Sequence, residues 1–179
     1  LVAYYQKLGH FDTGIFGTDI VTRVLFEHGD GQTAVNLLLS EDIISYDGMR
    51  QAGATTLWEY WPCSLRDRSR NHPMFGAIAA YLYDHLLGIQ NRPGSIAYED
   101  IVIAPVLVEG IGKLSGDRLL PGGKVAVTYE KGTNTTVYGK AGRDATFHIM
   151  IPDGQKAIFV YKDVEYPLVA GENHFIISI

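Results

Sequence analysis

The residues best suited to chemistry lie in one irregular stretch, residues 53–76, which reads GATTLWEYWPCSLRDRSRNHPMFG. It holds an acidic residue between aromatic ones, and a histidine that opens an apolar segment: Trp58, Glu59, Tyr60, Trp61 and His72. Sugar rings lay their C–H faces on aromatic planes, and their hydroxyls need a few fixed polar partners. Hydrolysis of a glycosidic bond also needs carboxyl groups held by a rigid scaffold. The stretch is therefore typical of a carbohydrate site.

The residues alone leave two other interpretations open. The Trp-Glu-Tyr-Trp run also fits a buried aromatic cluster whose Glu59 turns to solvent. From the residues alone this interpretation and the carbohydrate site are about equally favoured. A further alternative is a non-catalytic carbohydrate-binding or structural module, in which the tryptophans bind sugar and no reaction follows. We interpret Asp12-Thr13 as an ordinary helix cap. No metal site is expected, because His85 has no Cys or second His at ligand spacing, and no cofactor is expected either.

Three strings of the sequence resemble a known family. GHFDTGIFGT (residues 9–18), GATTLWEYW (53–61) and SRNHPMFGA (69–77) are similar, in this order, to the end of the catalytic domain of bacterial α-L-rhamnosidases. Those are inverting glycoside hydrolases with an (α/α)6 barrel. The C-terminal half, ending GENHFIISI, resembles the small β-sandwich that follows that barrel. The resemblance covers nearly the whole chain, although another (α/α)6 glycosidase with a different sugar remains an alternative.

The resemblance implies a role for each candidate residue. Glu59 matches the glutamate that acts as general base, and His72 matches a histidine that lines the sugar pocket. Trp58 and Trp61 match aromatic positions of the same loop and are expected to bind substrate. The implied reaction removes terminal α-L-rhamnose from glycans or glycosides with inversion, so the expected partner is a rhamnose-containing carbohydrate.

The resemblance also implies that part of the enzyme is missing. The family's general acid, and most residues that grip rhamnose, lie earlier in the barrel, and no part of this chain resembles that region. We therefore expect a C-terminal fragment that is inactive alone. Helices cut from a closed barrel expose faces that missing neighbours would cover, so we expect self-association through those faces or local rearrangement.

The hydrophobic pattern predicts an α+β fold in two parts: helical hairpins from an (α/α)6 barrel, then an antiparallel β-sandwich. Apolar residues recur at helical spacing over four segments, and Pro73 is suited to the first turn of a fifth helix that would run to Ile89. Gly9 is expected to end the first helix and Thr18 to cap the second. The helices are predicted at residues 1–8, 18–27, 32–40, 43–52 and 73–89.

Beyond the polar QNRPG segment (residues 90–94) the pattern changes to strict alternation, so we place the domain boundary there, with domains at residues 1–92 and 93–179. Several short strands separated by Gly- and Pro-containing turns are typical of a sandwich. The predicted strands are 101–105, 124–130, 135–140, 145–151, 156–161 and 174–179.

Composition excludes some classes of partner. The 179 residues are 46% hydrophobic and 20% charged, with a net charge of −5, as in ordinary globular proteins. There is no basic stripe for nucleic acid, and no apolar run is long enough for a membrane span. The single cysteine excludes an internal disulfide. Leu1 begins the chain within a predicted helix, as expected of a truncated parent, whose localisation, cytoplasmic or periplasmic, stays unknown.

Overall fold

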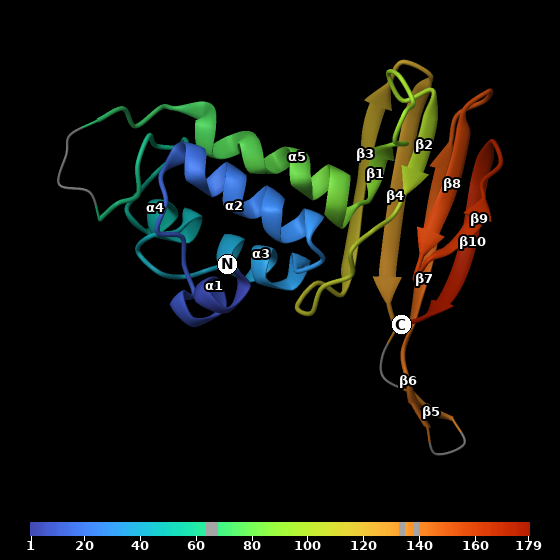
Figure 1. Cartoon of the computed structure of the whole chain (residues 1–179), viewed down its shortest axis with the longest axis horizontal. Coiled ribbons are helices and arrows are strands. Elements are labelled where there is room, and N and C mark those ends of the chain that lie inside the picture. Colours follow the sequence, from blue (N-terminus) through green and yellow to red (C-terminus); the bar gives the residue numbers. More distant parts are fainter. Residues whose placement is uncertain (64–67, 133–134, 138–139) are drawn as a thin grey trace. The chain divides into compact units, whose positions relative to one another are not determined.

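The computed structural model describes residues 1–63, 68–132, 135–137 and 140–179, and only the backbone of residues 135–137 and 140–142. The chain divides into two compact units, residues 1–81 and 82–179 (Figure 1). The first is helical and the second is built from strands, so the predicted α+β class is confirmed.

The first unit consists of short helices around one apolar core. They are α1 (Val2–Leu8), α2 (Ile15–Glu27), α3 (Gly31–Leu38) and α4 (Tyr46–Gln51). The helices α2 and α3 pack together as the predicted hairpin, and Leu25 and Leu37 are completely or almost completely buried in it. No helix in the described part of the chain is both long enough and apolar enough to cross a membrane.

The helix ends follow local chemistry, with one correction. Gly9 ends α1 at φ 75°, as predicted, because glycine adopts this left-handed conformation without steric cost. The side chains of Asp30 and Ser45 cap α3 and α4 by accepting backbone N–H groups. The prediction that Thr18 caps the second helix is wrong. That helix begins at Ile15, and Thr18 is buried inside it, with its hydroxyl donating to the carbonyl of Thr13 at 3.2 Å.

The helical run after Pro73 is irregular. It begins as the 3-10 helix η1 (Pro73–Ile78), continues as α5 (Ala79–Tyr81), and ends as the π-helical turn η2 (Leu82–Leu86). The prediction that this helix reaches Ile89 is wrong. The chain turns at Gly88, where φ is 75° and an added Cβ would lie 2.3 Å from the nitrogen of Pro105, so only glycine fits.

The second unit contains two four-stranded sheets and one small hairpin. The first sheet has the order β1 (Ile89–Asn91), β2 (Asp100–Ile103), β8 (Lys156–Tyr161), β9 (Val164–Pro167). The second has the order β10 (Gly171–Ser178), β7 (Asp144–Ile151), β4 (Gly123–Lys131), β3 (Lys113–Leu120). β5 (Thr135–Val137) pairs with β6 (Lys140–Gly142). All neighbours are antiparallel except β2 and β8, which run parallel.

Alternating side chains from both sheets form the core of this unit. On β4, Val125, Val127 and Tyr129 are fully buried, while the intervening side chains are more exposed. The ring centre of Phe147 on β7 lies 4.9 Å from that of Phe159 on β8, with the rings tilted by 49°, and this contact joins the two sheets. The predicted alternation of β4 therefore positions one face against a covering layer.

The described residues of the predicted strand 135–140 belong to two paired strands, β5 and β6, and its residues 138–139 lie outside the described ranges. The sequence pattern does not predict β1, β3 and β9. The first and last have three and four residues, too few to show a period. β3 reads KLSGDRLL, where glycine and charged residues hide the alternation. It is an edge strand, paired only with β4 among the described residues, and such charged composition suits an edge.

We predict that replacing Ile149 with Ala lowers the free energy of unfolding of the second unit by about 2–5 kcal/mol, because a cavity would remain in the core. Ile149 is only 1% exposed. Chemical denaturation followed by far-ultraviolet circular dichroism measures this loss, and tryptophan fluorescence follows the other unit, which holds both tryptophans.

The matched control is Ile176→Ala on the neighbouring strand, where the side chain is 76% exposed. It should change stability by no more than about 0.5 kcal/mol. Equal losses in the two variants would contradict the assignment of the core.

Candidate functional site

The candidate site is built on two chain segments that pair through their backbones. The N–H of Glu59 donates to the carbonyl of Ser69 at 2.9 Å, and the N–H of His72 donates to the carbonyl of Leu57 at 2.8 Å. The hydroxyl of Thr56 adds a bond to the carbonyl of Arg70. These bonds hold the backbones of Glu59 and His72 in one local structure, although the two residues are thirteen positions apart.

The Glu59 carboxylate is partly exposed and accepts two donors. Its Oε1 lies 3.3 Å from a guanidinium nitrogen of Arg68, and its Oε2 accepts the N–H of Ser69 at 3.3 Å. The side chain retains 25% exposure. A carboxylate has about four acceptor positions, so two directions remain for a water or hydroxyl. The group therefore has both an anchor and access to solvent.

His72 lies at the start of η1 and acts as its cap. Its Nδ1 accepts the N–H of Met74 at 3.5 Å, and the ring is half-buried. When Nδ1 accepts a hydrogen bond, the neutral ring carries its proton on Nε2. The helix start thus fixes the ring and leaves Nε2–H as a donor. Pro73 follows at a position that needs no amide donor.

Trp61 is the packing centre of the site. Its ring is stacked on Phe11 at 6.0 Å and lies 4.1 Å from Phe75, and Tyr46 meets it edge-on at 5.4 Å. Its Nε1–H donates to the carbonyl of Thr13 at 2.7 Å. The residue is only 6% exposed. Both its apolar surface and its polar group are engaged inside the protein.

Trp58 is also mostly covered. It is 7% exposed, and the guanidinium of Arg70 lies 4.8 Å from its ring centre. A cation over an indole face is a stabilising arrangement. One face of this ring is thereby occupied, and the exposed remainder is small.

The loop before α2 differs from the sequence-based interpretation. Asp12 does not cap a helix, because the cap position is Gly14, which has no capping side chain. Instead the Asp12 carboxylate accepts the hydroxyl of Tyr4 at 2.6 Å and that of Tyr5 at 2.8 Å. These two donors lower the pKa of Asp12, which is the direction expected for a carboxylate that accepts hydrogen bonds. Asp12 fixes the loop whose Thr13 carbonyl holds Trp61.

Two hollows flank the site. One, of about 300 Å³, is lined by residues of α4, among them Met49, and by residues 54–57. The other, of about 230 Å³, lies between the start of α2 and η1, where Phe16 and Met74 contribute to its wall. Glu59 lines neither of them. No group of three or more His, Cys, Asp or Glu residues that could hold a metal occurs in the described ranges.

The first unit thus combines a helical hairpin, α2 and α3, with an irregular segment that carries the Glu59 carboxylate between two buried tryptophans. Residues 3–86 match the family described as the bacterial alpha-L-rhamnosidase 6 hairpin glycosidase domain. An alpha-L-rhamnosidase of Formosa agariphila is 32% identical over 129 residues, which cover 68% of this chain and 14% of that relative. The chain therefore belongs to the α-L-rhamnosidase family and spans about a seventh of the length of such relatives.

Solved structures agree in fold. The native rhamnosidase of Aspergillus terreus has a TM-score of 0.85 over 99% of this chain and 21% of its own, at 18% identity. The rhamnosidase of Streptomyces avermitilis complexed with L-rhamnose has a TM-score of 0.78 over 96% of this chain and 18% of its own, at 19% identity. At such identities the likeness concerns the fold.

We predict that Trp61→Ala lowers the free energy of unfolding of the first unit by about 3–5 kcal/mol, as for other buried tryptophans. Urea denaturation followed by the fluorescence of Trp58 measures it. The control Phe16→Ala removes a side chain that is 68% exposed and should cost no more than about 0.5 kcal/mol. An unchanged unfolding midpoint for Trp61→Ala would contradict its role as packing centre.

We also predict an acid-sensitive contribution from Asp12. Its pKa in the folded state lies below its ordinary value of 3.8, so its stabilising effect is complete above about pH 4 and is lost as the pH falls through the folded-state value. Asp12→Asn should flatten the decline of the unfolding midpoint below about pH 4. The double variant Tyr4→Phe/Tyr5→Phe keeps the carboxylate but removes both donors, and it should flatten the decline in the same way. An unaltered acid profile in both variants would refute the assignment.

Proposed function

We propose that this chain is the C-terminal part of an inverting α-L-rhamnosidase, in which Glu59 is the general base. The observation that carries the proposal is the Glu59 carboxylate itself. It is anchored by Arg68 and Ser69, keeps 25% exposure, and lies in the part of the chain that matches the glycosidase family. The substrate proposed is a terminal α-L-rhamnose on a glycan or glycoside.

In the proposed reaction Glu59 takes a proton from a water molecule, and that water attacks the anomeric carbon. A second carboxyl group, the general acid, gives a proton to the leaving oxygen on the opposite face of the ring. In inverting enzymes the two carboxyl groups stand roughly 6.5–9.5 Å apart, so that the water fits beside the base. The general acid would come from the part of the enzyme that lies outside this chain.

The anchors of Glu59 suit this role. A general base must keep one lone pair directed at the water while its own position stays fixed. Arg68 and the amide of Ser69 each bind a different oxygen of the carboxylate, so rotation of the group is restrained and both oxygens keep an acceptor position. The backbone bond between Glu59 and Ser69 restrains the residue further.

The other site residues take different parts in the proposal. His72 would donate its Nε2–H to a sugar hydroxyl, because Nδ1 is engaged by Met74. Trp58 would offer the uncovered edge of its ring to the sugar. Trp61, whose faces are occupied by Phe11 and Phe75, would position the loop and would not touch the substrate.

The second candidate function is a module that binds carbohydrate without hydrolysing it. The observation that favours it is the ion pair between Glu59 and Arg68, which engages the carboxylate that catalysis would need. Exposed ion pairs of this kind contribute little, about 0–1 kcal/mol, so the pair is also compatible with a working base.

The apolar side chains left open on the first unit bear on association. On α2, Phe16 is 68% exposed and Ile20 is 49% exposed. We propose that missing parts of the barrel cover these residues in the longer enzyme, and that the isolated chain self-associates through them.

We predict that Glu59→Gln in the longer enzyme lowers turnover of an aryl α-L-rhamnoside by about 10²–10⁴-fold, the usual contribution of a general base. Substrate affinity and the unfolding midpoint should change little, because Gln keeps the size of the side chain. The control is Glu41→Gln, an exposed residue of the same type, which should keep full activity.

Three outcomes would contradict the proposal. A Glu59→Gln enzyme with most of its activity would rule out the general base, and rhamnose binding without turnover by the longer parent would favour the binding module. The isolated chain should show no turnover, and light scattering should report a mass above 19.8 kDa. Hydrolysis by the isolated chain would refute a general acid outside it.

A further inference from the structure

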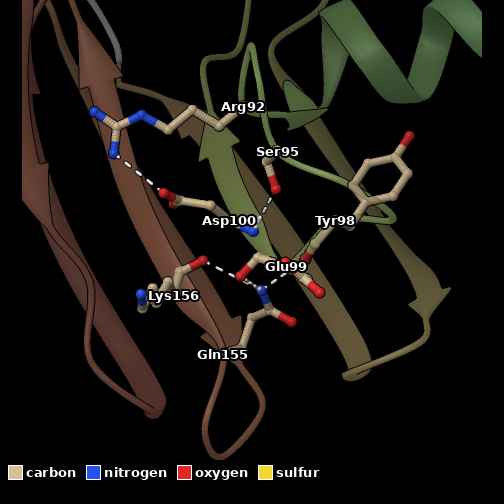
Figure 2. Close-up of polar contacts among 7 residues, drawn as sticks. All are labelled: Arg92, Ser95, Tyr98, Glu99, Asp100, Gln155 and Lys156. Carbon is tan, nitrogen blue, oxygen red and sulfur yellow. Dashed lines mark hydrogen bonds and ion pairs between the residues drawn. The ribbon is translucent and has the colours of Figure 1, made fainter.

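A large hollow lies in the second unit and is lined by residues of that unit alone. Its volume is about 790 Å³, within the range of roughly 300–1,000 Å³ that small-molecule sites occupy. Three segments form it: the 92–100 loop between β1 and β2, the turn between β3 and β4, and the turn between β7 and β8. Figure 2 shows side chains from the first and the last of these segments.

The 92–100 loop is held rigidly. The side chain of Asn91 accepts the N–H of Tyr98 at 2.8 Å and donates to the carbonyl of Ser95 at 2.7 Å. The hydroxyl of Ser95 accepts the N–H of Asp100 at 2.9 Å. Ala97 and Tyr98 have φ values of 51° and 62°, a left-handed conformation that non-glycine residues rarely adopt. Lys162 and Asp163, in the turn between β8 and β9, have similar φ values of 48° and 64°, so this pair of left-handed residues marks a tight, fixed turn.

Gln155 joins the opposite turn to this loop. Its Nε2 donates to the carbonyl of Tyr98 at 2.7 Å and to that of Glu99 at 2.9 Å (Figure 2). Its Oε1 lies close to Gly122: a Cβ added to that glycine would be only 2.3 Å from this oxygen. The amide therefore fixes the floor of the hollow before any ligand arrives, which reduces the entropy lost on binding.

The charges lining the hollow balance one another. Arg92 pairs with Asp100 at 3.3 Å. The carboxylate of Glu99 and the ammonium of Lys156 are exposed, and neither has an ion pair or side-chain hydrogen bond within the described residues. Two cations and two anions give no net charge, which disfavours a phosphate, a metal cation or a charged peptide as the preferred ligand.

We propose that this hollow binds a neutral carbohydrate of one or two sugar residues, as a site separate from the proposed catalytic one. Glu99 would accept a pair of sugar hydroxyls, and Lys156 would donate to a ring or hydroxyl oxygen. Pro93 and Pro121 supply apolar surface for the C–H groups of the sugar. A sugar carries many hydroxyl groups and no charge. Its hydroxyls can donate to a carboxylate and accept from an ammonium group, so it can use both groups although the site has no net charge.

The proposal goes beyond hydrolysis, because binding here needs no residue of the first unit. In the longer enzyme such a site would hold a second part of a glycan while the terminal sugar reacts elsewhere.

The test uses the isotope-labelled chain, titrated separately with L-rhamnose, D-glucose and D-galactose and followed by amide resonances in NMR spectra. We expect at least one sugar to give saturable shifts at residues 92–100, 121–122 and 154–156. The double variant Glu99→Gln/Lys156→Ala should weaken binding of that sugar by about tenfold or more, since each charged hydrogen bond is worth about that factor. Both side chains are exposed, so the unfolding midpoint should not change.

Three comparisons decide the outcome. Lys113→Ala, an exposed lysine on β3 that pairs with Glu130, is the matched control and should keep full affinity. Glu59→Gln should leave these shifts unchanged, so that failure of the proposed catalytic role is distinguishable from failure of this site. Absence of saturable shifts with every sugar, or saturation by inorganic phosphate or calcium chloride in place of sugar, would overturn the proposal.

Discussion

The candidate site depends on the packing of one indole ring. Trp61 lies between Phe11 and Phe75, meets Tyr46 at its edge, and donates its only polar hydrogen to the carbonyl of Thr13. Those partners belong to the loop before α2, to α4 and to η1, so one side chain joins three segments that are distant in the sequence. A ring of this size removes a large apolar area from water, and its N–H leaves no buried donor unsatisfied. The segments that carry Glu59 and His72 have no regular secondary structure of their own, and this packing is what gives them a fixed position.

The same constraint separates positioning from contact with substrate. The Trp61 side chain is only 6% exposed and both its faces are covered by Phe11 and Phe75, whereas the Glu59 carboxylate keeps 25% exposure and unused acceptor positions. Two residues of the same loop therefore differ in role. Trp61 is buried and holds the backbone in place, whereas the carboxylate of Glu59 faces solvent. The resemblance of both tryptophans to sugar-site positions does not distinguish these two roles, because a residue can be required in a site without touching the ligand.

Much of this organisation can be predicted from the sequence where one local signal dominates. The 3.6-residue period gives α2 and α3, Gly9 gives the end of α1, and the strict alternation of Val125, Val127 and Tyr129 gives β4 with its buried face. The failures occur where tertiary contacts override local preference. Ile89 continues a helical period but enters a strand, because Gly88 turns the chain against Pro105. Asp12 has the sequence context of a helix cap, but its carboxylate accepts hydrogen bonds from the hydroxyls of Tyr4 and Tyr5 in the preceding helix. The hollow beside Gln155 has no sequence signature at all, since it is assembled from three separate turns.

That hollow shows how a sandwich can acquire a site without disturbing its fold. The core of both sheets consists of buried apolar residues, so most residues in the turns at the strand ends do not contribute to this core. The 92–100 loop uses this freedom to adopt two successive left-handed residues, and Gln155 satisfies the two carbonyls that this conformation leaves unpaired. Strain of this kind costs about 1–3 kcal/mol per residue. Part of it is offset by packing, because the ring of Tyr98 lies against the core and 4.8 Å from the guanidinium of Arg118. The loop therefore joins the core at Tyr98 and presents its neighbouring polar groups at the edge of the unit, where the proposed sugar site lies.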